Sequence, residues 1–325
     1  MDPASIQALL ERHLPRAAAG CVVHGPVGAH QNSRTYRAEC RDFPFPLLVK
    51  LCVHSNSTAP DPVTARAQFL GLQQAWSKTR ADTHYRVPQP VLLLEPEGIL
   101  VMEWVEAPTM TERLYAWRAT DKEFTRHVGD AAEWLKRFHQ AHRLPDVTLN
   151  CREILPRLLD GDPAVRDSAL YRAGYALLRT TADRAVRVAL ECSYVHGDYK
   201  ADNLLVDGDR VVAIDVQLDH RNAVLFDIAS FLNHLELLVW HPRGLRIAMR
   251  RRGLVQYFIE RYFGSPLSAE RRVALLWVRL FNAMGAWIDL ALDNKSRLSY
   301  QYMSFCYRAL VRRLIREMVS VAGTV

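Results

Sequence analysis

The sequence predicts a two-lobed α+β protein, in which residues 1–105 form an antiparallel β-sheet with one main helix and residues 106–325 form a mostly helical lobe. Two observations support this prediction. Apolar residues recur with the period of a β-strand before Pro108 and with the 3.6-residue period of a helix after it. With 325 residues, the chain is also long enough to form two lobes with a sizeable core.

The first lobe is expected to begin with a short amphipathic helix and to continue mainly with strands. In chain order, the predicted segments are a helix over residues 6–14, strands over 20–24 and 34–40 around a polar turn at 25–33, a strand over 46–53, a helix over 62–78, and strands over 88–94 and 98–106. Asp61 and Pro62 are typical of a helix start, because Asp caps free N–H groups and Pro suits the first helical position. Lys50 lies inside an apolar strand, where its ammonium group needs an anionic partner.

The second lobe is expected to consist of helices and one β-hairpin. Residues 124–142 show helical spacing, and residues 150–190 are interpreted as further helical segments. The hairpin strands, 204–206 and 211–216, are joined through Asp207-Gly208-Asp209, a strong turn signal between apolar runs. The apolar stretch 273–292 contains Arg279 and Asp289, which favours a buried or amphipathic helix over a membrane span.

Cysteine usage and the N-terminus both favour a cytoplasmic protein. The six cysteines include no C-x-x-C pair, which argues against a zinc site and against a disulfide framework and fits a reducing compartment. The N-terminus has no basic segment followed by an apolar run, so a signal peptide is not expected.

The net charge of +7 is concentrated in the C-terminal third, where about fifteen Lys or Arg residues face about six Asp or Glu residues after residue 230. Five arginines lie close together there: Arg243, Arg246, Arg250, Arg251 and Arg252. The cluster indicates a neutral or anionic ligand and peripheral contact with an anionic membrane surface; the alternative is a solvated helix face. No recognised nucleic-acid motif appears, so we expect no nucleic-acid partner, and no obligate protein partner is evident.

Polar residues gather in the segment 191–231. His196-Gly197-Asp198 is followed by Lys200, by Asn203 five residues after the Asp, and by Asp215 at the end of an apolar run. The predicted hairpin brings these side chains to the ends of neighbouring strands. Carboxylate and amide oxygens at such a point are the hard ligands that Mg²⁺ prefers.

This segment resembles the catalytic loop of the aminoglycoside phosphotransferase-like family of small-molecule kinases, which includes choline kinase-like proteins and has a protein-kinase-like fold. The resemblance implies that the protein uses ATP and Mg²⁺ and moves the γ-phosphoryl group to a hydroxyl of a small molecule. It implies catalytic roles for Asp198, as proton acceptor, and for Lys200, which would neutralise the γ-phosphate. It also implies that Asn203 and Asp215 hold the metal.

The resemblance further implies a nucleotide site made from several segments of the first lobe. The implied cofactor-binding residues are Lys50, Asn32, Ser33, Gln68, Glu103 and Val105. Lys50 would pair with the α/β-phosphates, and the loop at residues 32–33 would cover the nucleotide. The main chain at residues 103–105 would hydrogen-bond the adenine edge.

One position departs from the family pattern. Kinases pair the strand Lys with a Glu on the next helix, whereas Gln68 stands at the matching spacing and carries no charge. Two alternatives therefore stay open: an active kinase, and a weak or inactive pseudokinase that binds nucleotide or acts as a scaffold.

The short segment between Asp215 and Asp227 favours a small-molecule acceptor, because a protein kinase needs a longer activation segment there. The resemblance implies that Asp227 accepts main-chain N–H bonds and braces the catalytic loop. The basic C-terminal third favours a sugar, a phosphorylated sugar or a glycolipid precursor over a polycationic aminoglycoside.

Overall fold

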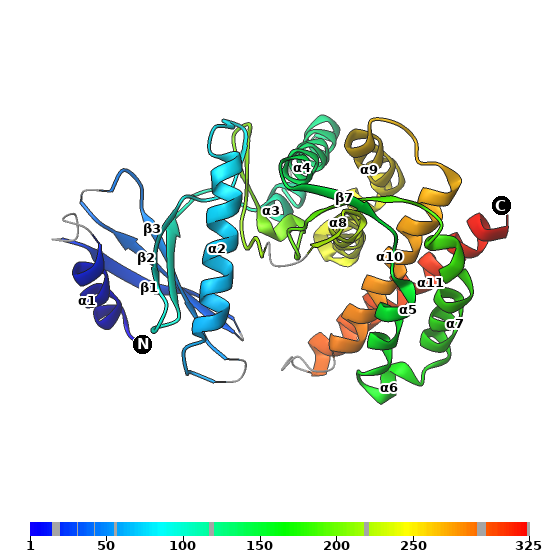
Figure 1. Ribbon diagram of the computed structural model, residues 1–325, viewed down its shortest axis with the longest axis horizontal. Coiled ribbons are helices and arrows are strands. Elements are labelled where there is room, and N and C mark those ends of the chain that lie inside the picture. The colour runs from blue at the N-terminus through cyan, green and yellow to red at the C-terminus, as the bar shows by residue number, and fades with distance from the viewer. Residues whose placement is uncertain are drawn as a thin grey trace. The chain divides into compact units, whose positions relative to one another are not determined.

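The computed structural model describes residues 1–14, 20–30, 32–41, 43–54, 57–116, 120–217, 221–290 and 297–323. It has the predicted α+β architecture, with an N-terminal antiparallel sheet followed by a mostly helical region (Figure 1). The chain forms two compact units, Met1–Thr109 with Asn203–Asp219, and Met110–Asp202 with His220–Val325. The domain boundary between residues 105 and 106 stays a prediction.

The first unit is built on a five-stranded antiparallel sheet with the order β1-β2-β3-β6-β5. Its strands are β1 (Val22–His30), β2 (Ser33–Glu39), β3 (Leu47–Cys52), β5 (Pro90–Leu94) and β6 (Ile99–Glu103). Helices α1 (Pro3–His13) and α2 (Pro62–Thr79) lie on opposite sides of this sheet (Figure 1). The start of α2 is as predicted, because the Asp61 side chain accepts the N–H of Thr64 at 3.0 Å.

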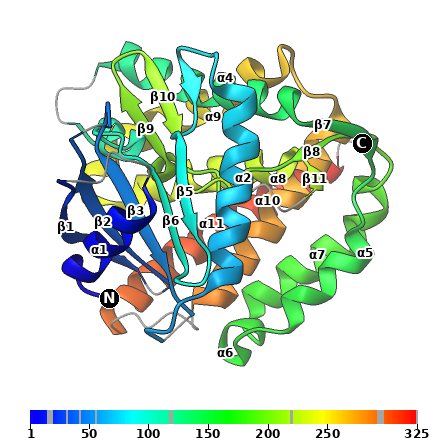
Figure 2. The same cartoon turned by 60° about the vertical axis from the view of Figure 1, so that its left-hand side comes forward.

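The alternation of side chains along β3 separates a hydrophobic core from the face that carries Lys50. Members of the core cluster from β3 and α1 are Leu47, Val49, Leu51, Ile6 and Leu10. Successive strand side chains point to opposite faces, so Lys50 and Cys52 point away from this cluster. Cys52 instead contacts Gln68 of α2, which packs along β5 and β6 (Figure 2).

A second sheet in the first unit contains the predicted hairpin. Strands β9 (Leu204–Asp207) and β10 (Arg210–Ala213) pair antiparallel, and β4 (Tyr85–Arg86) pairs parallel to β10. Gly208 has φ = 62° at the turn, a conformation that glycine adopts without strain. The prediction of the hairpin and of its Asp-Gly turn is confirmed.

The polar turn predicted at residues 25–33 is wrong, because β1 continues to His30. The chain reverses between His30 and Ser33, which pair with each other. The register shifts between His24 and Gly28, so the intervening residues form an irregularity within the strand instead of a turn. Gly25, which has φ = 126°, takes a conformation there that suits glycine.

Cys21 and Cys40 form a disulfide bond, so the prediction from the cysteine pattern that disulfides are absent is wrong. The two residues flank paired strands: Val22 pairs with Glu39, so the cysteines face each other with Cα atoms 4.1 Å apart. Sheet register brings them together, and their spacing of 19 residues carries no recognisable signal. The free cysteines among the described residues are all buried: Cys52, Cys151, Cys192 and Cys306.

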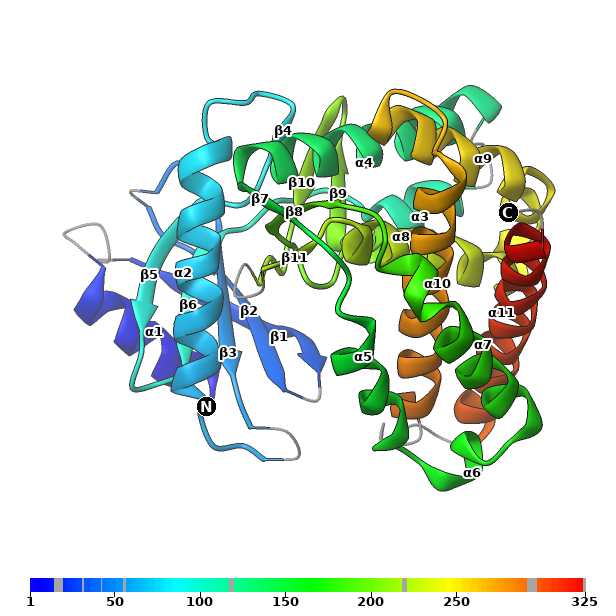
Figure 3. The same ribbon diagram turned by 45° about the vertical axis from the view of Figure 1, so that its right-hand side comes forward.

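The second unit is mostly helical. Its helices include α3 (Met110–Leu114), α4 (Asp121–Ala141), α5 (Cys151–Ile154), α6 (Pro163–Arg166), α7 (Ala169–Ala185), α8 (Leu225–Leu237), α9 (Leu245–Phe263), α10 (Ala269–Asp289) and α11 (Arg297–Gly323). Helix α10 packs against α7, α8 and α11, and α9 packs against α4 (Figure 3). A small antiparallel sheet, in the order β11-β8-β7, contains β7 (Arg143–Val147), β8 (Leu190–Tyr194) and β11 (Arg221–Ala223).

Helix α10 is buried, as its apolar sequence predicted, although it carries Arg279. This side chain is 2% exposed, and its guanidinium donates hydrogen bonds to Glu236 of α8 and, at 3.1 Å from Nε, to Asn233. The paired carboxylate makes burial of the charge tolerable. None of the helices in the described ranges is both long and apolar enough to cross a membrane.

Candidate active site

Lys50 and Asp215 form an ion pair in the first unit. Lys50 Nζ lies 2.6 Å from Asp215 Oδ1, and Lys50 is only 9% exposed. Because Lys50 lies on β3 and Asp215 follows β10, the pair links the two sheets of this unit. Asp215 thus supplies an anion for the ammonium group that the sequence places inside an apolar strand.

Asp215 also has an unusual backbone. With φ = 58° it is the non-glycine residue, among those the structure describes, that adopts a positive φ. This left-handed conformation costs an L-residue about 1–2 kcal/mol. Such strain persists where the surrounding structure enforces it, and it is concentrated at functional sites.

The two predicted metal ligands lie side by side. The N–H of Ile214 donates a 2.9 Å hydrogen bond to the carbonyl of Asn203, which places Asn203 beside the start of the Asp215 segment. Asn203 is 6% exposed, whereas the Asp215 side chain is 45% exposed. One carboxylate and one amide fit Mg²⁺, which is usually held by one or two protein groups together with phosphate oxygens.

Three of the predicted nucleotide-binding residues lie near the C-terminal end of β3, namely Asn32, Ser33 and Gln68. The carbonyl of Asn32 accepts the N–H of Val53 at 2.9 Å, and Ser33 pairs with Cys52 across the sheet. The side-chain oxygen of Gln68 lies 3.9 Å from Cys52 Sγ, a weak contact. Lys50 is therefore held by Asp215, whereas Gln68 contacts Cys52, two residues further along the strand.

Glu103 ends β6 with its side chain in an ion pair. Its two carboxylate oxygens lie 2.5 and 2.7 Å from the guanidinium of Arg86. The N–H of Glu103 donates to the carbonyl of Gln89 at 2.9 Å, and the carbonyl of Val105 accepts the N–H of Ala107 at 3.1 Å. The N–H of Trp104 donates to the carbonyl of Pro46 at 2.8 Å, so the predicted adenine contacts would have to come from the remaining main-chain groups of residues 103–105.

In the second unit, Asp227 holds the loop that begins at His196, which the resemblance implies to be the catalytic loop. It lies in the first turn of α8 and is 2% exposed. Its carboxylate accepts the main-chain N–H of His196 at 2.6 Å and that of Gly197 at 3.0 Å, as the resemblance implied. Gly197 has φ = 88°, so the loop turns where a side chain would add strain.

His139 completes this brace, a role that no motif in the sequence indicated. Its Nε2 lies 2.9 Å from Asp227 Oδ2, and its Nδ1 lies 2.7 Å from the hydroxyl of Tyr262. Burial alone would raise the pKa of Asp227, but the hydrogen bond and positive charge of His139, helped by His196, lower it below the usual value. No sequence signal connects residues on α4, α8 and α9, so this network needed the structure.

Asp198 and Lys200 form the second ion pair of the site. Lys200 Nζ lies 2.6 Å from Asp198 Oδ2, and both side chains are about one-third exposed, at 33% and 39%. They line a cavity of about 520 Å³ that lies within the second unit. The structure thus brings together Lys50, Asn203 and Asp215 in one unit, and Asp198 and Lys200 in the other.

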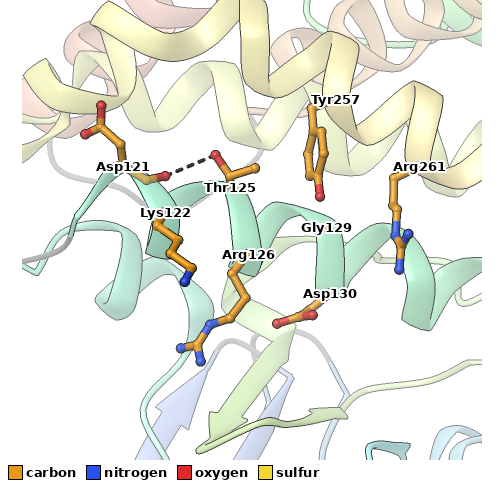
Figure 4. A pocket seen from close by; sticks show the side chains of 8 residues that line it. All are labelled: Asp121, Lys122, Thr125, Arg126, Gly129, Asp130, Tyr257 and Arg261. Atoms are coloured by element: carbon orange, nitrogen blue, oxygen red, sulfur yellow. Dashed lines mark hydrogen bonds between the residues drawn. The ribbon is translucent and has the colours of Figure 1, made fainter.

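A second cavity, of about 500 Å³, lies between α4 and α9 (Figure 4). Lys122 and Arg126 reach it from α4, and Tyr257 and Arg261 reach it from α9. The Tyr257 ring packs over Gly129, where an added Cβ would lie 3.0 Å from the ring. This cavity is open, and its lining mixes cations with carboxylates.

Neither described side chain of the arginine cluster, Arg243 or Arg250, lines the cavity at Asp198. Arg250 is paired with Asp121, and its guanidinium lies 5.6 Å from the centre of the Phe124 ring. Arg243 is exposed. The side chains of Arg246, Arg251 and Arg252 lie outside the described part of the chain.

The sequence matches the model of the phosphotransferase enzyme family over residues 26–272, which is more than half of the chain. No curated protein matches the sequence.

Solved structures of similar fold include several small-molecule kinases. A glucosamine kinase in complex with glucosamine, ADP and inorganic phosphate has a TM-score of 0.66 at 15% identity, covering 98% of this chain and 88% of that one. A choline/ethanolamine kinase family protein from Mesorhizobium loti has a TM-score of 0.58 at 12% identity, covering 98% and 94%. A putative fructosamine-3-kinase from Thermobifida fusca has a TM-score of 0.54 at 19% identity, covering 92% and 94%. At these identities the likeness shows the fold.

Proposed function

We propose, because this chain belongs to the phosphotransferase enzyme family, that it transfers the γ-phosphoryl group of ATP to a hydroxyl group of a small molecule. The observation that carries the proposal is the ion pair between Lys50 and Asp215. It holds a cation suited to phosphate next to a carboxylate suited to a metal, on a strained backbone that the fold maintains.

Each residue has a distinct part in this reaction. Lys50 binds the α/β-phosphates, and Asn203 and Asp215 hold Mg²⁺, which when bound supplies positive charge to the phosphate oxygens. The acceptor oxygen bonds to the γ-phosphorus, its proton passes to Asp198, and ADP leaves. Lys200, 2.6 Å from Asp198, neutralises the transferred group. Positioning and electrostatics account for the rate, and no covalent enzyme intermediate is needed.

The acceptor binds in the cavity lined by Asp198. Its volume of about 520 Å³ lies in the range of small-molecule sites. We propose a hydroxyl compound such as a sugar or a glycolipid precursor in preference to a polycationic aminoglycoside, because the cavity offers few carboxylates. Nucleotide contacts by Asn32, Ser33, Glu103 and Val105 belong to the same proposal.

A pseudokinase is the second candidate function, and Gln68 is the observation that favours it. The absence of a carboxylate at this position removes one anchor for the strand Lys. The ion pair with Asp215 offsets this loss, because it already fixes Lys50 at 2.6 Å. We therefore favour an active enzyme.

The decisive experiment measures Mg²⁺-dependent ATP binding by calorimetry and ADP formation with a panel of hydroxyl compounds. We expect wild-type turnover with at least one acceptor, loss of ATP binding in Asp215→Ala, and loss of turnover but not of ATP binding in Asp198→Ala. Asp209→Ala, on the exposed hairpin, is the matched control and should behave as wild type. ATP binding without turnover on any acceptor would favour the pseudokinase.

We also propose peripheral contact with an anionic membrane surface. Leu245 and Met249, one turn apart on α9, are 69% and 76% exposed. They lie in the basic C-terminal third of the chain, beside the exposed Arg243. Exposed apolar side chains among cations fit a lipid surface that carries negative charge.

A further inference from the structure

The cavity beside Asp198 has two chemically different walls. The catalytic loop contributes the charged lining residues Asp198, Lys200 and Asp202. We call these three residues the catalytic wall. The other lining residues form the helical wall: they lie on α8, α10 and α11, at Tyr115 after α3, and at Leu238 and His241 after α8. None of the described residues on this helical wall is an Asp, Glu, Lys or Arg.

The charges of the catalytic wall leave no cation for an anionic acceptor. Lys200 lies 2.6 Å from Asp198 and serves the transferred phosphoryl group in the proposed reaction, so it is not available to a second anionic group on the acceptor. Asp202 lies 3.7 Å from His234, and burial lowers the pKa of His234, which disfavours its positively charged form. A phosphate on the acceptor would therefore meet an excess of negative charge.

Two tyrosine hydroxyls of the helical wall are engaged in hydrogen bonds within the protein. The hydroxyl of Tyr115 donates to the carbonyl of Leu238 at 3.1 Å, and the hydroxyl of Tyr302 donates to the carbonyl of Trp240 at 2.7 Å. Each phenol has a single O–H, so neither hydroxyl has a further proton to donate to a ligand. Tyr115 also stacks on His241, with ring centres 4.6 Å apart.

The amides of this wall are engaged as well. Asn233 donates to the carbonyl of Arg279 at 2.8 Å and accepts from its Nε at 3.1 Å. Asn282 donates to the carbonyl of Phe226 at 3.4 Å. The other side chains of the wall include apolar ones, namely Leu237, Leu238, Ala283, Ala286 and Met303. Polar side chains at Ser230, His241 and Tyr307 also line this wall. The engaged hydroxyls and amides nevertheless leave fewer donors for a polyhydroxylated body, whereas an aromatic or aliphatic body would lose little.

We infer that the acceptor is an uncharged amphipathic alcohol, whose hydroxyl end reaches Asp198 and whose aromatic or aliphatic body lies against Tyr115, Tyr302 and the helical wall. The inference rests on the proposed function, because it names the substrate class of the same site. It narrows the acceptor to neutral compounds such as aryl or alkyl glycosides. It excludes the phosphorylated sugar that the basic C-terminal third had favoured.

The first test measures acceptor binding without nucleotide, by calorimetry and ligand-observed NMR. The probes are phenyl β-glucoside and octyl β-glucoside, each compared with glucose, glucose 6-phosphate and kanamycin. We expect the phenyl or octyl glucoside to bind at least about tenfold more tightly than glucose, because only these compounds bury an apolar body. We expect weaker binding of glucose 6-phosphate and of kanamycin than of either glycoside.

The second test locates the bound body. Ala286 is an exposed residue of α10 that lines the cavity, and Ala286→Trp fills the space there. We expect this variant to weaken glycoside binding by about tenfold or more. Ala176→Trp is the matched control, since Ala176 is likewise an exposed helical alanine, on α7, and does not line this cavity. Thermal unfolding of both variants checks that each is folded.

The outcomes separate the inference from the proposed function. The inference is overturned if glucose, glucose 6-phosphate or kanamycin binds more tightly than both glycosides, whether or not the protein transfers phosphate to that compound. An equal effect of the two Trp substitutions overturns it too. Glycoside binding that is lost only in Ala286→Trp supports it, even if no phosphate is transferred, and in that case the kinase proposal alone fails. Glycoside binding should also persist in Asp215→Ala, which disables the nucleotide site.

Discussion

The carboxylate of Asp227 lies 2.6 Å from the main-chain N–H of His196, so the second unit holds its catalytic loop by the backbone. A backbone bond fixes the path of the loop independently of which side chain stands at position 196. It sets the direction from which Asp198 reaches the cavity, and Gly197 allows the turn between the two. His139 in turn fixes Asp227.

Replacement of Asp227 by Asn should destabilise the protein in a pH-dependent way. The pKa of Asp227 is lowered in the folded state, so its contribution to stability is present above the usual value of 3.8 and is lost as the pH falls through the folded pKa. At neutral pH we expect Asp227→Asn to lower the free energy of unfolding by about 3 kcal/mol.

Urea unfolding between neutral pH and pH values below 3.8 measures this difference, which should shrink toward the acid end. Asp207→Asn, on an exposed hairpin residue, is the control and should leave stability unchanged. A constant difference across the pH range would contradict the role of the Asp227 carboxylate.

The left-handed backbone of Asp215 gives a second prediction. Both Asp215→Gly and Asp215→Ala remove the ion pair with Lys50, but only glycine relieves the conformation at φ = 58°. We expect Asp215→Gly to be more stable than Asp215→Ala by about 1 kcal/mol.

Asp209 offers the matched comparison, because it is not among the described residues with positive φ. There we expect the opposite order, with Ala more stable than Gly, since glycine adds freedom to the unfolded chain. Thermal unfolding of the four variants decides the matter. If the Ala variant were more stable than the Gly variant at position 215 as well, strain at Asp215 would be absent.

Local signals in the sequence predicted much of the fold. Asp61 before Pro62 marked the start of α2, and the Asp-Gly pair at residues 207–208 marked the hairpin, because caps and turns depend on neighbouring residues. The position of Lys50 in an apolar strand predicted that it has an anionic partner, and the structure supplies Asp215, 165 residues away.

Other features depend on pairing over long distances and left no local signal. The register of β1 and β2 decides that Cys21 faces Cys40, and a register shift keeps residues 25–27 within the strand. His139 reaches Asp227 across 88 residues because α4 packs beside the catalytic loop. The composition of the cavity at Asp198 likewise depends on which faces α8, α10 and α11 present, and net charge carries no information about that.

The contact of Gln68 gives a third prediction. Its side chain contacts Cys52 Sγ at 3.9 Å, whereas Lys50 is held by Asp215 at 2.6 Å. We expect Gln68→Ala to change the affinity for Mg²⁺-ATP by no more than about threefold, and Lys50→Ala to lower it by about 100-fold. Calorimetric titration measures both. Equal losses in the two variants would mean that Gln68 positions the lysine after all.

Counting thiols tests the disulfide bond. In the unfolded, unreduced chain we expect four reactive thiols, from the free cysteines, and six after reduction. Reduction should lower the free energy of unfolding by about 3 kcal/mol, the value for a closed loop of this size. The double variant Cys21→Ser, Cys40→Ser should give four thiols under both conditions, and six thiols before reduction of the wild type would refute the bond.

The exposed face of α9 gives the last prediction. Leu245 and Met249 are too exposed to contribute to the core, and a lipid surface would bury them while the surrounding cations approach anionic headgroups. We expect co-sedimentation with phosphatidylserine-containing vesicles, little binding to neutral vesicles, and release by salt, because the attraction is screened over a Debye length.

Met249→Glu should lower the bound fraction by about fivefold or more, since it replaces apolar burial with repulsion. Val319→Glu is the matched control: Val319 is also exposed, at 55%, but lies on α11. Equal effects of the two substitutions would show that net charge alone accounts for vesicle binding and that α9 is not the contact surface.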